Sequence, residues 1–156
     1  MTIRNAESKD AEKILDLLKQ VLEIHAKIRP DIFVSGTTKY SAEELKELFK
    51  DESKPIYVAV NEKDSVLGYA FCQIKEQPSA PFMVPFKSMY IDDLCVDSTC
   101  RGQHIGERLF EYVKCQAKKL GCYQVTLHVW SGNDSAEHFY QKMGMKPQKS
   151  LLEMVL

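Results

Sequence analysis

The sequence predicts an α/β fold: a single domain in which about four helices flank a mixed, mostly antiparallel central sheet. Helical and strand-like periodicities alternate along its 156 residues. A chain of this length can bury a core large enough to fold without disulfides or a metal ion. No internal repeat or low-complexity stretch interrupts it, so we expect residues 1–156 to form one domain.

The N-terminal elements are a strand, a helix and a loop. Residues 2–4 favour a short strand. Ser8 offers an N-cap to a helix whose apolar side chains recur at helical spacing. Pro30 ends that helix, because the residue before a proline avoids the α region. The segment 29–40 has turn residues and no period, which predicts a loop.

A second helix and a hairpin follow. Ser41 and Glu44 form a capping box ahead of a short helix. The β-rich runs 56–60 and 66–74 flank a polar turn, which is typical of a β-hairpin. Residues 77–85 contain three prolines and no period, and predict a loop.

Strands and helices alternate in the rest of the chain. Residues 88–96 predict a strand, and residues 105–120 an amphipathic helix that Gly121 ends. Residues 123–130 are rich in β-branched side chains and predict another strand.

The last two elements are a helix and a strand. Asp134 and Glu137 resemble a capping box, which opens a helix that ends at Gly144. Residues 151–156 predict a final strand at the end of the chain.

Composition excludes several classes of protein. A net charge of -1 argues against a nucleic-acid partner or a polybasic membrane surface. The first residues lack the apolar region of a signal peptide, and no run approaches the roughly 18 apolar residues of a membrane span. The five cysteines form no Cys-x-x-Cys pair, so we expect no metal site. We expect reduced thiols in a cytoplasmic protein.

The strand, turn and helix start over residues 94–106 form a candidate cofactor-binding segment. A helix N-terminus presents unpaired N–H groups and partial positive charge, which together bind phosphate. Glycines let the backbone approach a ligand, and an arginine adds charge-assisted hydrogen bonds. The alternative is an ordinary turn with glycines for packing. The candidate cofactor contacts are Leu94, Cys95, Val96, Arg101, Gly102, Gln103, His104, Ile105 and Gly106.

The second candidate segment lies on the last helix. Asn133, Ala136 and Tyr140 fall near one helix face, from which the tyrosine can direct its hydroxyl toward the same pocket. The alternative is a packed aromatic pair, Phe139 and Tyr140, with no role in chemistry.

Together the two segments resemble the GCN5-related N-acetyltransferase (GNAT) family. In that family the turn Arg/Gln-x-x-Gly-x-Gly/Ala holds the pyrophosphate of coenzyme A, and a later Asn-x-x-Ala-x-x-Phe-Tyr-x-x-x-Gly-Phe run supplies a cofactor-contacting asparagine and a catalytic tyrosine. The resemblance covers the order of elements along the whole chain. It implies acetyl-coenzyme A as co-substrate, Asn133 and Tyr140 as cofactor contacts, and Tyr140 as a catalytic residue.

The sequence departs from the family pattern at two positions. Met145 replaces the usual phenylalanine, and His104 replaces a glycine of the turn. A residue other than glycine fits there if its backbone is helical. The ring of His104 could then donate to phosphate or face solvent.

Two adjacent aspartates, Asp92 and Asp93, interrupt an otherwise apolar strand. Burying carboxylates is costly, so we expect them to face an opening. Adjacent strand residues point to opposite faces unless a bulge intervenes. The run around them is similar to a strand of diamine acetyltransferases, which implies that Asp92 is the general base and that Asp93 helps to hold a cationic acceptor. The residues alone leave open which of the two is the base.

Other acceptor contacts are expected from the loop that contains Asp31 and from His128, which lies in the strand predicted over residues 123–130. An alkyl ammonium has a pKa near 10.4, so its proton must be removed before attack on the thioester. A backbone N–H of residues 94–96 can meet the oxyanion, and Tyr140 can protonate the leaving thiolate.

The sequence therefore predicts direct acetyl transfer, in a ternary complex, from acetyl-coenzyme A to a primary amine, with a small cationic amine as the expected acceptor. Three alternatives remain: a protein N-terminus or lysine as acceptor, a non-catalytic acyl-coenzyme A-binding module, and an interaction module in which the cleft is vestigial. No residue names the acceptor, and a homodimer is compatible with the sequence.

Overall fold

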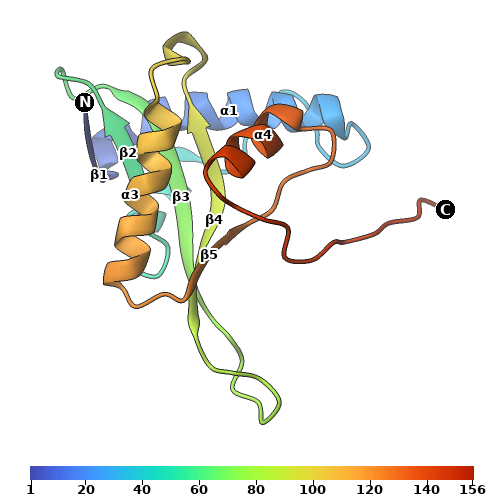
Figure 1. The fold of residues 1–156 in the computed structure, drawn as a ribbon. Helices are drawn as coiled ribbons and strands as arrows, with labels where there is room; N and C mark the ends of the chain where they lie inside the picture. The colour runs from blue at the N-terminus through green and yellow to red at the C-terminus, as the bar shows by residue number, and fades with distance from the viewer.

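The computed structural model describes all residues from 1 to 156, and its strands form one sheet in the order β1-β2-β3-β4-β5 (Figure 1). Neighbouring strands are antiparallel except β4 and β5, which are parallel. The expected mixed, mostly antiparallel sheet with four helices is thus confirmed. The strands are β1 (Thr2–Asn5), β2 (Ile56–Val60), β3 (Val66–Glu76), β4 (Lys87–Val96) and β5 (Gln124–Leu127). The helices are α1 (Ala11–Ile28), α2 (Ala42–Leu48), α3 (Ile105–Lys119) and α4 (Asp134–Lys142).

Helices cover both faces of the sheet, with α1 and α2 on one side and α3 on the other (Figure 1). Every residue of β2 is buried, and alternate side chains enter the two apolar clusters. Val58 packs against the α1 side, whereas Ala59 faces the α3 side, where Phe110 and Leu109 fill the core. None of these helices is both long and apolar enough to cross a membrane.

The helix starts agree only partly with the predicted caps. The capping box of Ser41 and Glu44 is confirmed: the Ser41 hydroxyl accepts from the Glu44 N–H at 3.1 Å, and the Glu44 carboxylate accepts from the Ser41 N–H at 3.3 Å. Ser8 does not cap the first helix. A short 3₁₀ turn (Ser8–Asp10) precedes α1, because Asp10 accepts the N–H of Glu7 at 2.8 Å.

The cap of α4 lies one residue earlier than expected. The Asn133 side chain accepts from the N–H of Ala136 at 3.3 Å, so Asn133 is the N-cap. Asp134 then occupies the first turn, where the helix dipole favours its charge.

The predicted last strand, residues 151–156, is absent, which corrects the sequence-based expectation. Residues 146–156 form an extended tail that leaves the body of the molecule (Figure 1). No backbone hydrogen bond joins residues 146–156 to any strand, and an isolated strand is not stable. The strand predicted over 123–130 is also shorter, because β4 pairs with β5 only between Ser88 and Ile91.

Candidate active site

A β-bulge in β4 determines where the two aspartates point. Phe71 of β3 pairs with Asp93, but its neighbour Cys72 pairs with Ile91, so Asp92 is the extra residue. The bulge shifts the alternation of side chains: Ile91 lies in the α3-side core, and Asp93 faces the opposite side with Tyr69. Bulges commonly re-aim side chains near functional sites. Both carboxylates therefore emerge on the α1–α2 side of the sheet.

The side chain of Asp93 is surrounded by protein atoms on most sides but remains partly exposed to solvent. The Tyr69 hydroxyl donates a hydrogen bond to Asp93 Oδ2 at 2.6 Å, and Tyr69 itself is fully buried. Burial raises the pKa of Asp93 to about 6, although the Tyr69 hydrogen bond and the positive charge of Lys39 oppose the shift. A carboxyl group with this pKa can accept a proton near neutral pH.

Asp92 is more exposed and already holds an ammonium group. The Nζ of Lys39, in the loop after α1, lies 2.5 Å from Asp92 Oδ2 and 5.5 Å from the centre of the Tyr40 ring. Burial is the largest single effect and opposes the charge of Lys39, but the hydrogen bond to Asp92 and the nearby negative charges together outweigh it and raise the lysine pKa. A cavity of about 210 Å³ adjoins this pair and is also lined by Lys54 and Phe71.

The N-terminus of α3 offers free hydrogen-bond donors. The backbone N–H groups of residues 101–107 donate to no group of the protein, and α3 has no capping side chain. Of the expected contacts, Gln103, His104, Ile105 and Gly106 thus present unpaired N–H groups at the positive end of the helix dipole. This arrangement can hold phosphate oxygens.

The structure corrects the expected backbone of His104. Its φ of 58° and ψ of 21° are left-handed, not helical, and so explain why a glycine suits this position. The His104 ring faces solvent, with Nδ1 3.2 Å from Glu107 of the first turn. Gly102 also has a positive φ, of 82°, so two of three consecutive residues are left-handed here.

Gly106 has a different role from Gly102. A Cβ at Gly102 would meet nothing within 4 Å, whereas a Cβ at Gly106 would lie 3.4 Å from the ring of Phe139. A Cβ at position 106 would thus be in ordinary van der Waals contact with Phe139, which shows how closely α4 packs on the start of α3. This contact positions Tyr140, the next residue of α4.

Tyr140 lies between the aromatic core and the site. Its ring packs on Phe110 and Phe139, with centroids 6.1 Å and 5.0 Å away. No protein group makes a hydrogen bond to its hydroxyl. Burial, followed by the charge of Asp93, raises the pKa of Tyr140, so the phenol stays protonated near neutral pH. The packed pair of Phe139 and Tyr140, which was the alternative to a catalytic role, is present. This packing leaves the Tyr140 hydroxyl free to interact with a ligand.

The end of β4 has an unpaired edge. β4 pairs with β5 as far as Ile91, and beyond that point only β3 flanks it. The backbone of Leu94 to Val96 is thus free on the side that faced β5. These are the residues from which an N–H was expected to meet the oxyanion.

Asp31 and His128 are engaged elsewhere. Asp31 accepts two hydrogen bonds from Arg29, at 2.9 Å and 2.8 Å, while Lys39 from the same loop is the residue that reaches Asp92. His128 Nδ1 lies 2.9 Å from the hydroxyl of Tyr90 on β4 and is exposed.

Sequence reasoning missed Lys39 and Tyr69 as members of the site. Lys39 lies in a loop without a period, and Tyr69 belongs to a strand whose apolar pattern indicates only core. Tyr69 pairs with Cys95, two residues from Asp93. The register of β3 and β4 would therefore have placed Tyr69 beside Asp93, but that register cannot be read from a single sequence.

Comparisons with known proteins identify the family of the chain. A sequence model of the acetyltransferase (GNAT) family matches residues 18–145. The peptidyl-lysine N-acetyltransferase YjaB of Salmonella typhimurium is 27% identical over 146 residues, covering 94% of this chain and 83% of that protein. The glucosamine 6-phosphate N-acetyltransferase of Arabidopsis thaliana is 37% identical over 59 residues, a match that spans only 38% of each chain.

Among solved structures, a mutant of the BH1408 protein of Bacillus halodurans superposes with a TM-score of 0.95. It is 35% identical, and the match covers 100% of this chain and 99% of that one. The family match runs from within α1 to just beyond α4 and includes both motif segments. The chain therefore belongs to the acetyltransferase (GNAT) family and is an N-acetyltransferase.

Proposed function

We propose that this enzyme transfers the acetyl group of acetyl-coenzyme A to a primary amine of a small cationic molecule. The observation that carries the proposal is the ion pair of Lys39 with Asp92, beside Asp93. A primary ammonium of the chain itself is already bound at Asp92. The same charges and the Tyr40 ring favour the ammonium of an acceptor, which would displace Lys39.

Acetyl-coenzyme A binds, in this proposal, with its pyrophosphate at the start of α3. The free N–H groups of Gln103 to Gly106 support it, because they need acceptors and the helix dipole favours anions. Arg101 can add a charge-assisted hydrogen bond. The unpaired edge of β4 at Leu94 to Val96 would receive the pantetheine and the thioester, and Asn133 would contact the cofactor from the start of α4.

We assign the base to Asp93 and the binding of the ammonium to Asp92. The resemblance to diamine acetyltransferases implied the reverse. Asp93 has a pKa of about 6, so it is largely ionised at neutral pH and can still take up a proton. Its charge also acts on Tyr140, which supports a short path between the base and the proposed acid.

The reaction is then a direct displacement. Asp93 takes a proton from the ammonium, directly or through water, and the amine nitrogen forms a bond to the thioester carbon. A backbone N–H of the β4 edge stabilises the oxyanion. The C–S bond breaks, Tyr140 protonates the departing thiolate, and the second proton lost by the nitrogen as the amide forms restores the Tyr140 hydroxyl. Binding both reactants in one site supplies much of the acceleration.

An acetyl-cysteine intermediate is not part of this proposal. The two cysteines that lie next to the site on β3 and β4 are Cys72 and Cys95, and both are buried. Burial raises the pKa of each thiol to about 12, so neither supplies a thiolate near neutral pH.

A panel of amines, read by the release of coenzyme A, tests the acceptor class. Polyamines and aminoglycosides should be acetylated faster than neutral amines or amino acids with a free carboxylate. Asp92→Asn should raise the KM of cationic acceptors and leave that of neutral amines nearly unchanged. Clearly better turnover of neutral or acidic amines would overturn the cationic class, and no turnover of any amine would favour a binding module.

A second candidate acceptor is the lysine of a peptide or protein. Lys39 supports it, since the group bound at Asp92 in this structure is itself a lysine side chain. YjaB is named as a peptidyl-lysine N-acetyltransferase, and the Arabidopsis relative as one for glucosamine 6-phosphate. Both a lysine peptide and glucosamine 6-phosphate therefore belong in the panel.

A further inference from the structure

Lys39 occupies the position that the amine of an acceptor would need. Its Nζ lies 2.5 Å from Asp92 Oδ2, and its side chain is about half exposed, beside the cavity of about 210 Å³. Burial is the largest influence on the pKa of both Lys39 and Asp93, and each also feels the charge of the other. A primary amine of the chain itself therefore stands next to the carboxylate that we assign as the base.

The segment that contains Lys39 is fixed against the sheet. The ring of the next residue, Tyr40, stacks on Phe71 with the ring centroids 5.9 Å apart and the planes 7° from parallel. Phe71 is in turn the residue that pairs with Asp93 across β3 and β4. Ser41 then begins the capping box of α2. Because a nucleophile held in place reacts far more readily than one free in solution, this anchoring favours a reaction within the chain.

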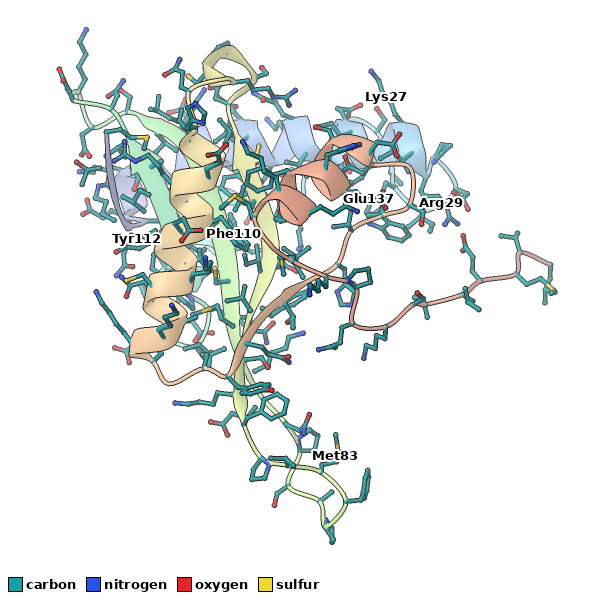
Figure 2. The ribbon with its side chains drawn as sticks, in the orientation of Figure 1. Lys27, Arg29, Met83, Phe110, Tyr112 and Glu137 are labelled. Carbon is teal, nitrogen blue, oxygen red and sulfur yellow. The ribbon has the colours of Figure 1, made fainter.

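The other lysines are placed differently. Lys54 lines the same cavity but makes no ion pair with Asp92 or Asp93. Lys27 is exposed near the end of α1 and projects from the body of the molecule (Figure 2). Five further lysines pair with carboxylates other than these two aspartates: Lys9, Lys13, Lys50, Lys114 and Lys142.

We propose that the enzyme acetylates its own Lys39 from acetyl-coenzyme A, and that this modification opens Asp92 to the acceptor. The inference rests on the proposed function, because it uses the same base, acid and cofactor site. Asp93 takes one proton from the Lys39 ammonium, and Nζ forms a bond to the thioester carbon. The C–S bond breaks, Tyr140 protonates the thiolate, and the second proton lost by Nζ restores the Tyr140 hydroxyl. Asp93 then releases its proton to solvent.

Acetylation changes Lys39 from a competitor of the acceptor into a neutral side chain. The ammonium has three N–H donors and a positive charge, whereas the acetylated nitrogen has one N–H and no charge. The ion pair with Asp92 is therefore lost, and the ammonium of an acceptor meets a free carboxylate. The reaction occurs once in each chain and prepares the site for later turnovers.

The first test is peptide mass spectrometry of the full chain after incubation with acetyl-coenzyme A alone. We expect one acetyl group on Lys39, formed at a rate that does not depend on protein concentration. Lys27 and Lys54 report the chemical background and should be modified far more slowly. Asp93→Asn should slow the acetylation of Lys39 by about 10²–10⁴-fold, or to that background. An unmodified Lys39, or equal modification of the three lysines, would overturn the proposal.

A mixing experiment tests whether the reaction stays within one chain. Asp93→Asn chains at natural isotope abundance are mixed with ¹⁵N-labelled wild-type chains and acetyl-coenzyme A. Acetylated Lys39 should appear only in the labelled chains. Its appearance in Asp93→Asn chains would show that Lys39 is modified by another molecule, and would contradict a reaction within the chain.

A kinetic test measures the effect on the acceptor site. Pre-incubation with acetyl-coenzyme A should lower the KM of a polyamine in the wild type. Lys39→Arg keeps the charge and lacks the reactive amine, so pre-incubation should leave its KM unchanged. Lys39→Gln resembles acetyl-lysine and should have the low KM from the start. A KM that stays constant in fully acetylated wild type would contradict the opening of Asp92.

The same measurements distinguish this inference from the proposed function. Turnover of free amines without acetylation of Lys39 would overturn the inference and leave the proposed function intact. If neither Lys39 nor any free amine is acetylated, both are wrong.

Discussion

The hydroxyl of Tyr69 lies 2.6 Å from Oδ2 of Asp93 and connects a fully buried phenol to the carboxylate that we assign as the base. The contact exists because the bulge at Asp92 turns Asp93 toward the α1–α2 side of the sheet. Tyr69 donates to the ionised form of Asp93 and so lowers its pKa, while burial, the larger effect, raises it to about 6.

The rate should depend on the ionisation of Asp93. Below pH 6 this carboxyl is protonated and cannot accept the proton of the amine, so kcat/KM should fall as pH decreases through about 6. Asp93→Asn should lower kcat by about 10²–10⁴-fold, the usual contribution of a general base. A pH profile of kcat/KM measures both effects.

Two variants should shift the acidic limb of this pH profile, which is the fall of kcat/KM through about pH 6, in opposite directions. Tyr69→Phe removes a hydrogen bond that favours the ionised form, so the limb should shift to higher pH. Asp92→Asn removes a negatively charged neighbour that disfavours the ionised form of Asp93, so the limb should shift to lower pH. If neither variant moves the limb, Asp93 is not the group that titrates.

Lys39→Met should make the acceptor site easier to occupy. The methionine keeps most of the length of the side chain but removes the ammonium that pairs with Asp92. A cationic acceptor no longer competes with it, so KM should fall, by roughly 5-fold for a partly exposed pair worth about 1 kcal/mol. Lys39→Arg, which keeps the charge, is the control and should change KM much less. A higher KM in Lys39→Met would mean that Lys39 helps to bind the acceptor.

Tyr140→Phe should separate catalysis from cofactor binding. The ring remains packed on Phe110 and Phe139, and only the hydroxyl is lost. Turnover should fall by about 10²–10⁴-fold, as expected for a general acid, while the Kd of coenzyme A measured by calorimetry should stay within a few-fold. Tyr112→Phe, on α3 beside Tyr57, provides a control. An unchanged rate would leave Tyr140 as a packing residue.

Substitutions of Gly106 should test the phosphate site. Alanine and proline both add a Cβ that lies 3.4 Å from Phe139, but only proline removes the N–H. Losing one charge-assisted hydrogen bond of about 1.5–3 kcal/mol should weaken coenzyme A binding by roughly 10- to 100-fold in Gly106→Pro. Gly106→Ala should bind within a few-fold of the wild type. Equal affinities in the two folded variants would contradict the assignment.

His104→Gly should stabilise the fold. A residue with a Cβ pays about 1–2 kcal/mol in the left-handed region that His104 occupies, and glycine does not. Glycine also adds freedom to the unfolded chain, so the net gain should be about 1 kcal/mol, or roughly 2–4 °C in Tm. His104→Ala also loses the contact with Glu107 but keeps the Cβ. The Tm of His104→Gly should therefore be higher than that of His104→Ala. The reverse order would contradict backbone strain at position 104.

The sequence by itself determined the elements with strong local signals. The capping box of Ser41 and Glu44 forms because both partners lie within one turn of the chain. Helical periodicity marked α1 and α3, and the two motif segments indicated the family through residues close together in the sequence. All of these features depend on interactions between near neighbours.

Tertiary structure alone decided how the candidate site is assembled. A bulge depends on how two strands pair, so no local pattern could show that Asp92 and Asp93 share one face. The partners of these carboxylates, Lys39 and Tyr69, come from segments 53 and 24 residues away. The predicted last strand failed for the same reason. Residues 151–156 have the composition of a strand, but a strand forms only where another extended segment lies beside it.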